Sequence, residues 1–314
     1  MTSRVSLLRR ASLIALIGNA LLAGTKLIAG AISGSLAVVG DGIDSTTDVA
    51  VAIVALFAAK IVDKPGDREH PYGHSRAETV ATTVLAFILF FAGAQLFLRT
   101  LGDILSGASH VLPSRIAIAA TVVSILGKLA LAWSQFRYGR KAGSPMLIAN
   151  AKNMRGDVVV SVGVLLGLGF TFVLGIPLLD RVTALLVSLW IVKVAAGIFL
   201  ETNIELMEGN NDRGPYSAIF AAVEEVEGAG NPHRTRLRRL GSLFIVDLDI
   251  EVDPSMTVAD AHDIAIEVEN AIKGRLPGVY DVIVHIEPRG NREEGERYGL
   301  RPSEQDAAKD GTLR

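Results

Sequence analysis

The chain has 314 residues, of which 50% are hydrophobic and 20% are charged. Soluble domains average about 25% charged residues, so this composition indicates several buried or lipid-facing segments. The chain contains no cysteine, which excludes disulfide scaffolds, cysteine-ligated zinc or iron–sulfur sites and thiol catalysis. Its formal net charge of −2 lacks the basic excess that nucleic-acid binding requires, so we expect no nucleic-acid partner.

Six apolar stretches precede residue 208, and each is about as long as the roughly 20 residues that cross a bilayer as a helix. They cover residues 11–32, 36–60, 79–101, 113–135, 146–177 and 180–203. Lys and Arg gather at the N-terminus and in loops 60–78 and 136–145, whereas the intervening loops carry almost none. The positive-inside rule therefore predicts six transmembrane helices with both termini in the cytoplasm. We expect the cell (inner) membrane as the host bilayer.

A change of composition after Glu208 predicts a second domain. We expect a transmembrane transport domain over residues 1–208, a small cytoplasmic α/β domain over 209–290 and a disordered polar tail over 291–314. The predicted elements of the small domain are a helix over 215–227, two strands within 237–253 around a turn at 241–242, a helix over 257–274 that ends at Gly274, and a strand over 282–286. Their order is α-β-β-α-β.

Carboxylates in the second and fifth apolar stretches form the main candidate site. Asp44 and Asp48 are spaced i, i+4 and share a helix face, and Asn153 and Asp157 repeat this spacing. Carboxylates at membrane depth are costly, and two adjacent ones repel unless a proton or a cation lies between them. If the two helices face each other, the four side chains form an oxygen-ligand site that exchanges a divalent metal against protons. The alternative is a polar clamp between helices, with Asp157 at the membrane interface.

Other ionisable residues within the apolar stretches are interpreted as supporting residues. We interpret Asp41, one turn before Asp44, as a supporting or helix-packing residue. Lys26, Lys128 and Lys193 are interpreted as helix-packing or charge-balancing residues rather than substrate ligands.

The loop DREHPYGHSRAE at residues 67–78 offers a second candidate metal site. Asp67, His70 and His74 supply one carboxylate and two imidazoles, which suit Zn²⁺ and its neighbours. Two histidines with a structural or incidental role are the alternative.

The small domain offers a third candidate site, because its three histidines lie near strand or helix ends and two acids lie on the predicted strands. These residues are His233, Asp249, His262, His285 and Glu287. Surface or core-edge histidines are the alternative interpretation.

The six spans, the run GDGIDSTTD at residues 40–48, the run HPYGHSRAE at 70–78, Asp157 and the cytoplasmic α/β domain together resemble the cation diffusion facilitator family. The resemblance covers roughly residues 8–290. Further matches within this range are His233, His262 and the run VHIEP at 284–288. It implies a homodimeric antiporter, not an enzyme, that exports a divalent transition metal in exchange for protons. It also implies a ferredoxin-like, metallochaperone-like cytoplasmic domain in which metal acts as a possible regulator, with no further cofactor.

The resemblance maps the family's sites onto this chain. The transport site falls on Asp44, Asp48, Asn153 and Asp157, the loop site on Asp67, His70 and His74, and the regulatory site on His233, Asp249, His262, His285 and Glu287. A charged contact between the third and sixth spans falls on Arg76 and Glu208.

Asn153 departs from the family pattern, because zinc-transporting members usually carry a histidine there. An all-oxygen site favours harder ions, so Mn²⁺ or Fe²⁺ is expected over Zn²⁺. A Zn²⁺, Co²⁺ or Cd²⁺ exporter of the same family and a passive divalent cation channel remain as alternatives. A membrane metalloenzyme is disfavoured because the sequence lacks the His-Glu-x-x-His pattern.

Overall fold

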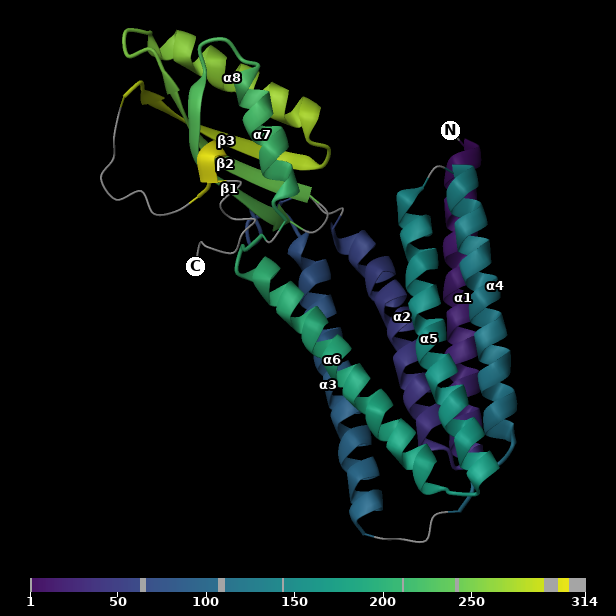
Figure 1. Ribbon diagram of the computed structural model, residues 1–314. Coiled ribbons are helices and arrows are strands. Elements are labelled where there is room, and N and C mark those ends of the chain that lie inside the picture. Colours follow the sequence, from purple (N-terminus) through teal and green to yellow (C-terminus); the bar gives the residue numbers. More distant parts are fainter. Residues whose placement is uncertain are drawn as a thin grey trace. The chain divides into compact units, whose positions relative to one another are not determined.

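The structure is a computed structural model that describes residues 2–62, 66–106, 111–142, 144–210, 212–240, 243–290 and 299–304. The chain divides into two compact units (Figure 1). The helical unit comprises Met1–Ile61 and Ala81–Leu200, and the α/β unit comprises Val62–Val80 and Glu201–Arg314. Each unit is described by itself.

Six long helices run through the first two thirds of the chain, as the sequence predicts. They are α1 (Thr2–Ser33), α2 (Leu36–Val62), α3 (Arg76–Leu105), α4 (Ile116–Ala142), α5 (Pro145–Leu174) and α6 (Leu178–Leu206). Among the described residues, α1 and α3 to α6 are long and apolar enough to cross a membrane. The remaining helix, α2, has 27 residues, which at about 1.5 Å per residue is also long enough, and it carries three aspartates.

Helix ends in the helical unit are fixed by local capping. Ser144 accepts a hydrogen bond from the Leu147 N–H at the start of α5, and Gly175 ends that helix in the left-handed conformation with φ 68°. Asp180 on α6 accepts hydrogen bonds from Ser35 Oγ at 2.5 Å and from the Leu36 N–H at 3.1 Å. This buried carboxylate therefore caps α2 and fastens α6 to the turn between α1 and α2.

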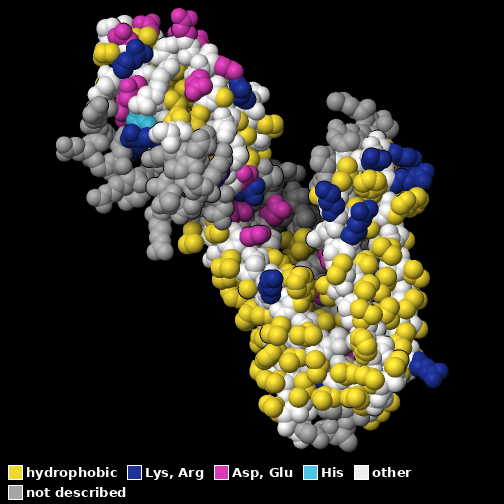
Figure 2. Space-filling view, in the orientation of Figure 1, with side chains coloured by type: hydrophobic (Ala, Val, Ile, Leu, Met, Phe, Trp, Pro, Cys, Tyr) yellow, Lys and Arg dark blue, Asp and Glu magenta, His cyan; other side chains and the backbone are white. Residues whose placement is uncertain are grey.

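Small and branched side chains form the contacts between helices. Helix α4 packs against α1 and α5, and a buried cluster joins α2, α5 and α6 through residues such as Val38, Val164, Leu168, Ala184 and Val187. Figure 2 shows hydrophobic side chains over the outer face of these helices and Lys and Arg gathered at the end of the bundle where the chain begins. An apolar surface of this extent is typical of a membrane-facing protein.

The α/β unit has the predicted element order. Its elements are α7 (Gly214–Glu224), β1 (Gly230–Leu240), β2 (Leu243–Val252), α8 (Val258–Arg275), β3 (Val279–Pro288) and the short 3₁₀ helix η1 (Pro302–Glu304). The strands lie in the order β1-β2-β3, with β1 antiparallel and β3 parallel to β2. The core contains Ile219 and Val223 of α7, Val246 and Leu248 of β2, and Ile272 of α8.

Several boundaries differ from the sequence-based expectation, including the end of α7 at Glu224 and the two ends of β3. Strand β1 begins at Gly230 rather than near Leu237, because its first half is polar and irregular in register and so lacks alternating hydrophobic residues. Helix α8 continues through Gly274 to Arg275. The predicted turn at 241–242 lies outside the described residues.

Part of the predicted disordered tail is placed against the sheet. Leu300 forms an antiparallel bridge with Thr235, with N–H···O distances of 3.2 and 2.9 Å, and its side chain packs against the core. One apolar residue in a polar segment suffices for this contact. Residues 291–298 and 305–314 lie outside the described part of the chain.

Candidate functional site

Asp48 of α2 and Asp157 of α5 share one cation, the ammonium group of Lys128 on α4. Lys128 Nζ donates a hydrogen bond to Asp48 Oδ2, lies 3.0 Å from Asp157 Oδ2, and also donates to Asn19 Oδ1 of α1 at 3.2 Å. The lysine side chain is 7% exposed, whereas the two carboxylates are 22% and 23% exposed. The second and fifth spans are thus close enough for their acids to hold the same positive charge.

The other two residues of the predicted quartet lie on the same two helices. Asp44 is half-buried on α2, one turn before Asp48. Asn153 is exposed on α5, one turn before Asp157. Among the described residues, the groups of three histidine or carboxylate ligands that lie within 4.8 Å of one another do not include Asp44, Asp48 and Asp157. The oxygens of these three acids therefore do not close around one point in this structure.

A second buried charge cluster lies beside these acids. Lys26 Nζ on α1 lies 2.9 Å from Asp41 Oδ2 and donates to Ser45 Oγ at 2.9 Å and to Ser161 Oγ at 2.8 Å. Ser161 on α5 donates in turn to Asp41 Oδ1 at 2.9 Å. The cluster joins α1, α2 and α5. Lys193, in contrast, is exposed and lies 5.4 Å from the centre of the Trp190 ring.

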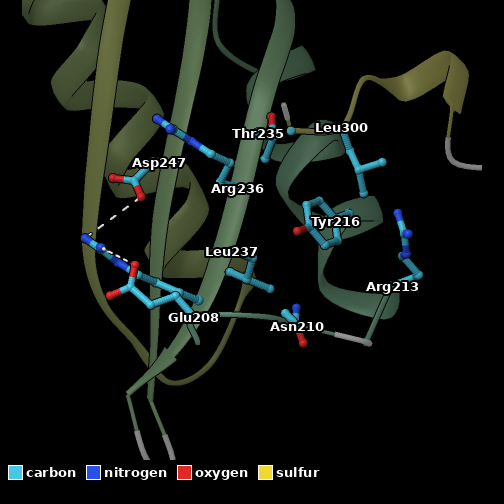
Figure 3. A pocket seen from close by; sticks show the side chains of 11 residues that line it. Glu208, Asn210, Arg213, Tyr216, Thr235, Arg236, Leu237, Asp247 and Leu300 are labelled. Atoms are coloured by element: carbon cyan, nitrogen blue, oxygen red, sulfur yellow. Dashed lines mark hydrogen bonds and ion pairs between the residues drawn. The ribbon is translucent and has the colours of Figure 1, made fainter. Parts of the chain in front are cut away.

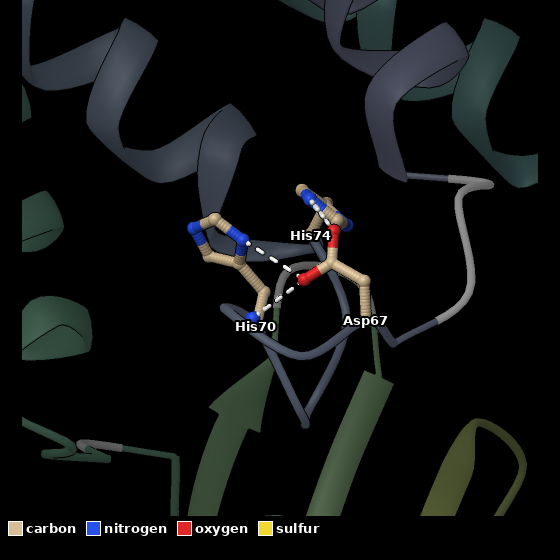
Figure 4. Close-up of side chains that lie close together, drawn as sticks. All are labelled: Asp67, His70 and His74. Atoms are coloured by element: carbon tan, nitrogen blue, oxygen red, sulfur yellow. Dashed lines mark hydrogen bonds and ion pairs between the residues drawn. The ribbon is translucent and has the colours of Figure 1, made fainter.

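The loop residues Asp67, His70 and His74 come together (Figure 4). Asp67 Oδ1 accepts the backbone N–H of His70 at 2.7 Å and that of Glu69 at 2.9 Å, which folds the loop into a turn. The Asp67 carboxylate lies 3.4 Å from His70 Nδ1 and 3.5 Å from His74 Nε2. The backbone hydrogen bonds, led by that of His70, lower the pKa of Asp67. This exposed carboxylate therefore stays anionic at a lower pH than an ordinary aspartate does. An anion beside two imidazoles is a ligand set that zinc-like ions favour.

The sheet gathers three of the five residues predicted for the small domain. His233, Asp249 and Glu287 come within 4.8 Å of one another, and all three are buried. The pairing of His233 with Asp249 across β1 and β2, and of Asp249 with His285 across β2 and β3, brings these strand positions together.

The other two predicted residues, His285 and His262, are not part of this cluster. His285 is 62% exposed, with Nε2 3.7 Å from Glu287 Oε1, and His262 is exposed on α8. Arg234, which the sequence reasoning did not single out, places Nη1 2.9 Å from Asp249 Oδ2.

Arg76 and Glu208 form the charged contact that the resemblance implies, with Nη2 2.7 Å from Oε1. The other Glu208 oxygen lies 3.4 Å from Arg238 Nη1 of β1. Arg238 also lines a pocket of about 400 Å³. Glu208 and Asp247 lie on one side of this pocket, and Tyr216 and Leu300 lie on the other (Figure 3).

Sequence reasoning missed the neutral and basic partners of these charges, because nothing in their local spacing indicates a partner. Asn19 accepts from Lys128 and Ser45 accepts from Lys26, whereas Ser161 contacts Asp41 and Arg234 contacts Asp249. The sequence did indicate that acidic partners exist, because a lysine buried in an apolar stretch is usually paired with an acid. The structure supplies that partner for Lys26 and Lys128.

Two family models match the chain almost end to end. The model described as "Cation efflux transmembrane domain" matches residues 12–207, and the model described as "Cation efflux protein, cytoplasmic domain" matches residues 212–289.

Individual relatives agree with these matches. The chain is 32% identical to the manganese efflux system protein MneS of Bacillus subtilis over 277 residues, which cover 88% of this chain and 94% of that protein. It is also 32% identical to the uncharacterized transporter YdbO of Bacillus subtilis over 281 residues, 89% of this chain and 95% of that protein. Among solved structures, the metal-bound C-terminal domain of the CzcD transporter from Thermotoga maritima is 40% identical and covers 25% of this chain and 92% of that chain, with a TM-score of 0.25.

Proposed function

This chain belongs to the cation efflux family, the cation diffusion facilitators, and is an integral membrane protein for divalent metal efflux; on that premise we propose that it exchanges metal against protons. The proposed ligands are Asp44, Asp48, Asn153 and Asp157. The observation that supports this site is the sharing of one cation by Asp48 and Asp157 from different helices.

The chemistry of the exchange follows from the charge of these side chains. With the carboxylates deprotonated and open to the cytoplasm, their negative charge offsets the dehydration of a divalent ion. When the helices rearrange to face the other side of the membrane, protons compete for the carboxylates and displace the metal. Protons bound there neutralise the acids for the return step, because closely spaced carboxylates repel when all are ionised.

Proteoliposomes test the coupling directly. An imposed pH gradient is expected to drive Mn²⁺ movement without ATP, and Asp48→Ala or Asp157→Ala is expected to reduce the initial rate to that of empty vesicles. Flux that follows the metal gradient but ignores the pH gradient would indicate a passive channel and contradict antiport.

We propose Mn²⁺ or Fe²⁺ as the preferred substrate over Zn²⁺, because Asn153 leaves only oxygen ligands at the site. The similarity to a manganese efflux protein supports this choice. Asn153→His adds the imidazole that zinc favours, and is expected to raise the Zn²⁺ rate relative to the Mn²⁺ rate in the same vesicles. An unchanged rate ratio would show that Asn153 does not set selectivity.

The remaining proposals concern assembly and orientation. We propose a homodimer, with residues 209–290 as a cytoplasmic domain in which metal at His233, Asp249 and Glu287 regulates the transport domain, residues 1–208. We also propose that both termini face the cytoplasm of a cell whose inner membrane holds the protein. The Lys and Arg residues at one end of the helical unit support this orientation.

A further inference from the structure

Lys128 occupies the position that a transported cation requires. Its Nζ contacts one oxygen of Asp48 and one of Asp157, and these carboxylates are the ligands proposed above for the metal. An ammonium group and a divalent ion cannot share the same pair of oxygens at contact distance, because their charges repel. Lys128 must therefore leave these carboxylates when metal enters.

Asn19 gives the ammonium group a place to go. Its side-chain oxygen already accepts from Lys128 Nζ at 3.2 Å, and it comes from α1, outside the α2–α5 pair that carries the acids. A lysine has a flexible four-carbon stem, so its charged end can shift toward this neutral acceptor while the helices stay in place. The lysine is 7% exposed and the acids are about three times more so, which leaves the carboxylates accessible while Lys128 stays buried.

The charge count matches a divalent ion. With all three deprotonated, Asp44, Asp48 and Asp157 carry three negative charges, and Lys128 carries one positive charge, so the metal-accepting form of the group has a net charge of −2. Lys26 is not included in this count because it pairs with Asp41. One divalent cation neutralises the group, whereas a monovalent cation leaves a buried negative charge, which is costly in a medium of low dielectric.

We propose that Lys128 is the resident counter-ion of the transport site: it bridges Asp48 and Asp157 when no metal is bound, and moves to Asn19 as a divalent metal displaces it. This inference rests on the proposed function, since it uses the same carboxylates. It makes metal affinity a competition between the incoming ion and a charge that belongs to the protein.

The test measures Mn²⁺ binding to the full chain in lipid nanodiscs by equilibrium dialysis. The transport-site signal is the part of the binding that Asp48→Asn removes. If Asp48→Asn removes none of the binding, the proposed transport site is wrong, which is a different failure from that of the lysine exchange.

Two substitutions of the lysine are expected to act in opposite directions. Lys128→Met removes the competing charge while keeping a linear side chain, and is expected to tighten transport-site binding by about tenfold or more. Lys128→Arg replaces the ammonium with a guanidinium that can hold both carboxylates at several points, and is expected to weaken binding by about threefold or more. Lys193→Met, which removes an exposed lysine from α6, is the matched control and is expected to leave binding unchanged.

Asn19 supplies a second, independent readout. Asn19→Leu removes an acceptor that the ammonium shares with two carboxylates before displacement but depends on afterwards. Because the bond is worth more in the displaced state, the substitution is expected to weaken Mn²⁺ binding by up to about fivefold in the wild-type background, the most that one hydrogen bond supplies. In the Lys128→Met background the same change is expected to have no effect.

A purely structural bridge gives different results. Weaker binding in both Lys128→Met and Lys128→Arg, failure of both variants to assemble, or an Asn19→Leu effect that persists without Lys128 would each overturn the proposal.

Discussion

Glu208 ties the end of α6 to both α3 and the sheet of the α/β unit. One of its oxygens lies 2.7 Å from Arg76 Nη2, and the other lies 3.4 Å from Arg238 Nη1. Arg76 also donates to the backbone carbonyl of Leu206 at 3.2 Å. Glu208 itself has φ 63°, a conformation that non-glycine residues seldom adopt. The two ion pairs therefore hold a strained residue at the point where the last long helix ends.

Glu208→Gln tests this junction, because glutamine keeps the shape of the side chain and removes its charge. The pairs are partly exposed, so the expected loss of stability is about 1 kcal/mol or less. Hydrogen exchange should nevertheless become faster at the end of α6 and in β1. Glu225→Gln is the control, since Glu225 is an exposed acid of the same unit that forms an ion pair with Arg275 of α8. Equal exchange in both variants would contradict a role for Glu208 as a junction.

Lys26 and Asp41 form the most deeply buried ion pair of the helical unit among the described residues, with side chains 3% and 1% exposed. Lys26→Met leaves the Asp41 carboxylate buried without its cation, which we expect to cost about 3–5 kcal/mol. Thermal unfolding in detergent should show a marked decrease in Tm. The double variant Lys26→Met with Asp41→Leu should recover part of that loss, because it removes the charge that was left unpaired.

Lys193→Met is the control for this pair, because Lys193 is exposed and its ammonium group makes a cation–π contact with Trp190, worth about 0.5–1 kcal/mol. A Lys26→Met variant that unfolds at the wild-type temperature would show that the buried pair does not stabilise the helices.

Asp67→Asn separates the charge of the loop from its fold. An asparagine oxygen can still accept the N–H groups of Glu69 and His70, so the turn should persist. The lost negative charge should weaken Zn²⁺ binding beside His70 and His74. Metal analysis after dialysis against Zn²⁺ should then find one ion fewer per chain than in the wild type. Glu69→Gln, in the same exposed loop, should retain the wild-type amount, and an identical loss there would contradict a specific role for Asp67.

Asp253 predicts a local dependence on pH. Its Oδ1 accepts the Oγ and the backbone N–H of Ser255, at 2.5 and 2.8 Å, and these hydrogen bonds lower the pKa of Asp253. Because the folded-state pKa is below the unfolded value, the turn before α8 gains stability at neutral pH and loses it as the pH falls through the folded pKa.

Ser255→Ala removes the hydroxyl donor and should raise the pKa of Asp253 toward its ordinary value. Carboxyl NMR of aspartate-labelled protein measures this change, with the exposed Asp263 as an internal reference. A pKa of Asp253 that stays low in the variant would assign the shift to the backbone contact alone.

Much of the fold follows from sequence patterns because it depends on local physics. Apolar stretches long enough to span a bilayer predicted the six helices, and alternation of side chains predicted β2. Strand β3 was predicted over residues 282–286 and extends further at both ends, from Val279 to Pro288. Where the alternation was absent, as in the first half of β1, the boundary was misplaced. The loop triad was also predictable, since Asp67, His70 and His74 lie within eight positions and a single turn brings them together.

Only the tertiary structure decided which charges meet. The spacing of Asp44 and Asp48, and of Asn153 and Asp157, placed each pair on a helix face, but no local pattern indicates that Lys128 lies between α2 and α5 or that Lys26 pairs with Asp41. The same holds for Arg234 beside Asp249 in the sheet. The physical reason is that helix period and hydropathy are properties of a single segment. The partner of a buried charge depends on how separate segments pack, and this packing depends on contacts along the whole chain.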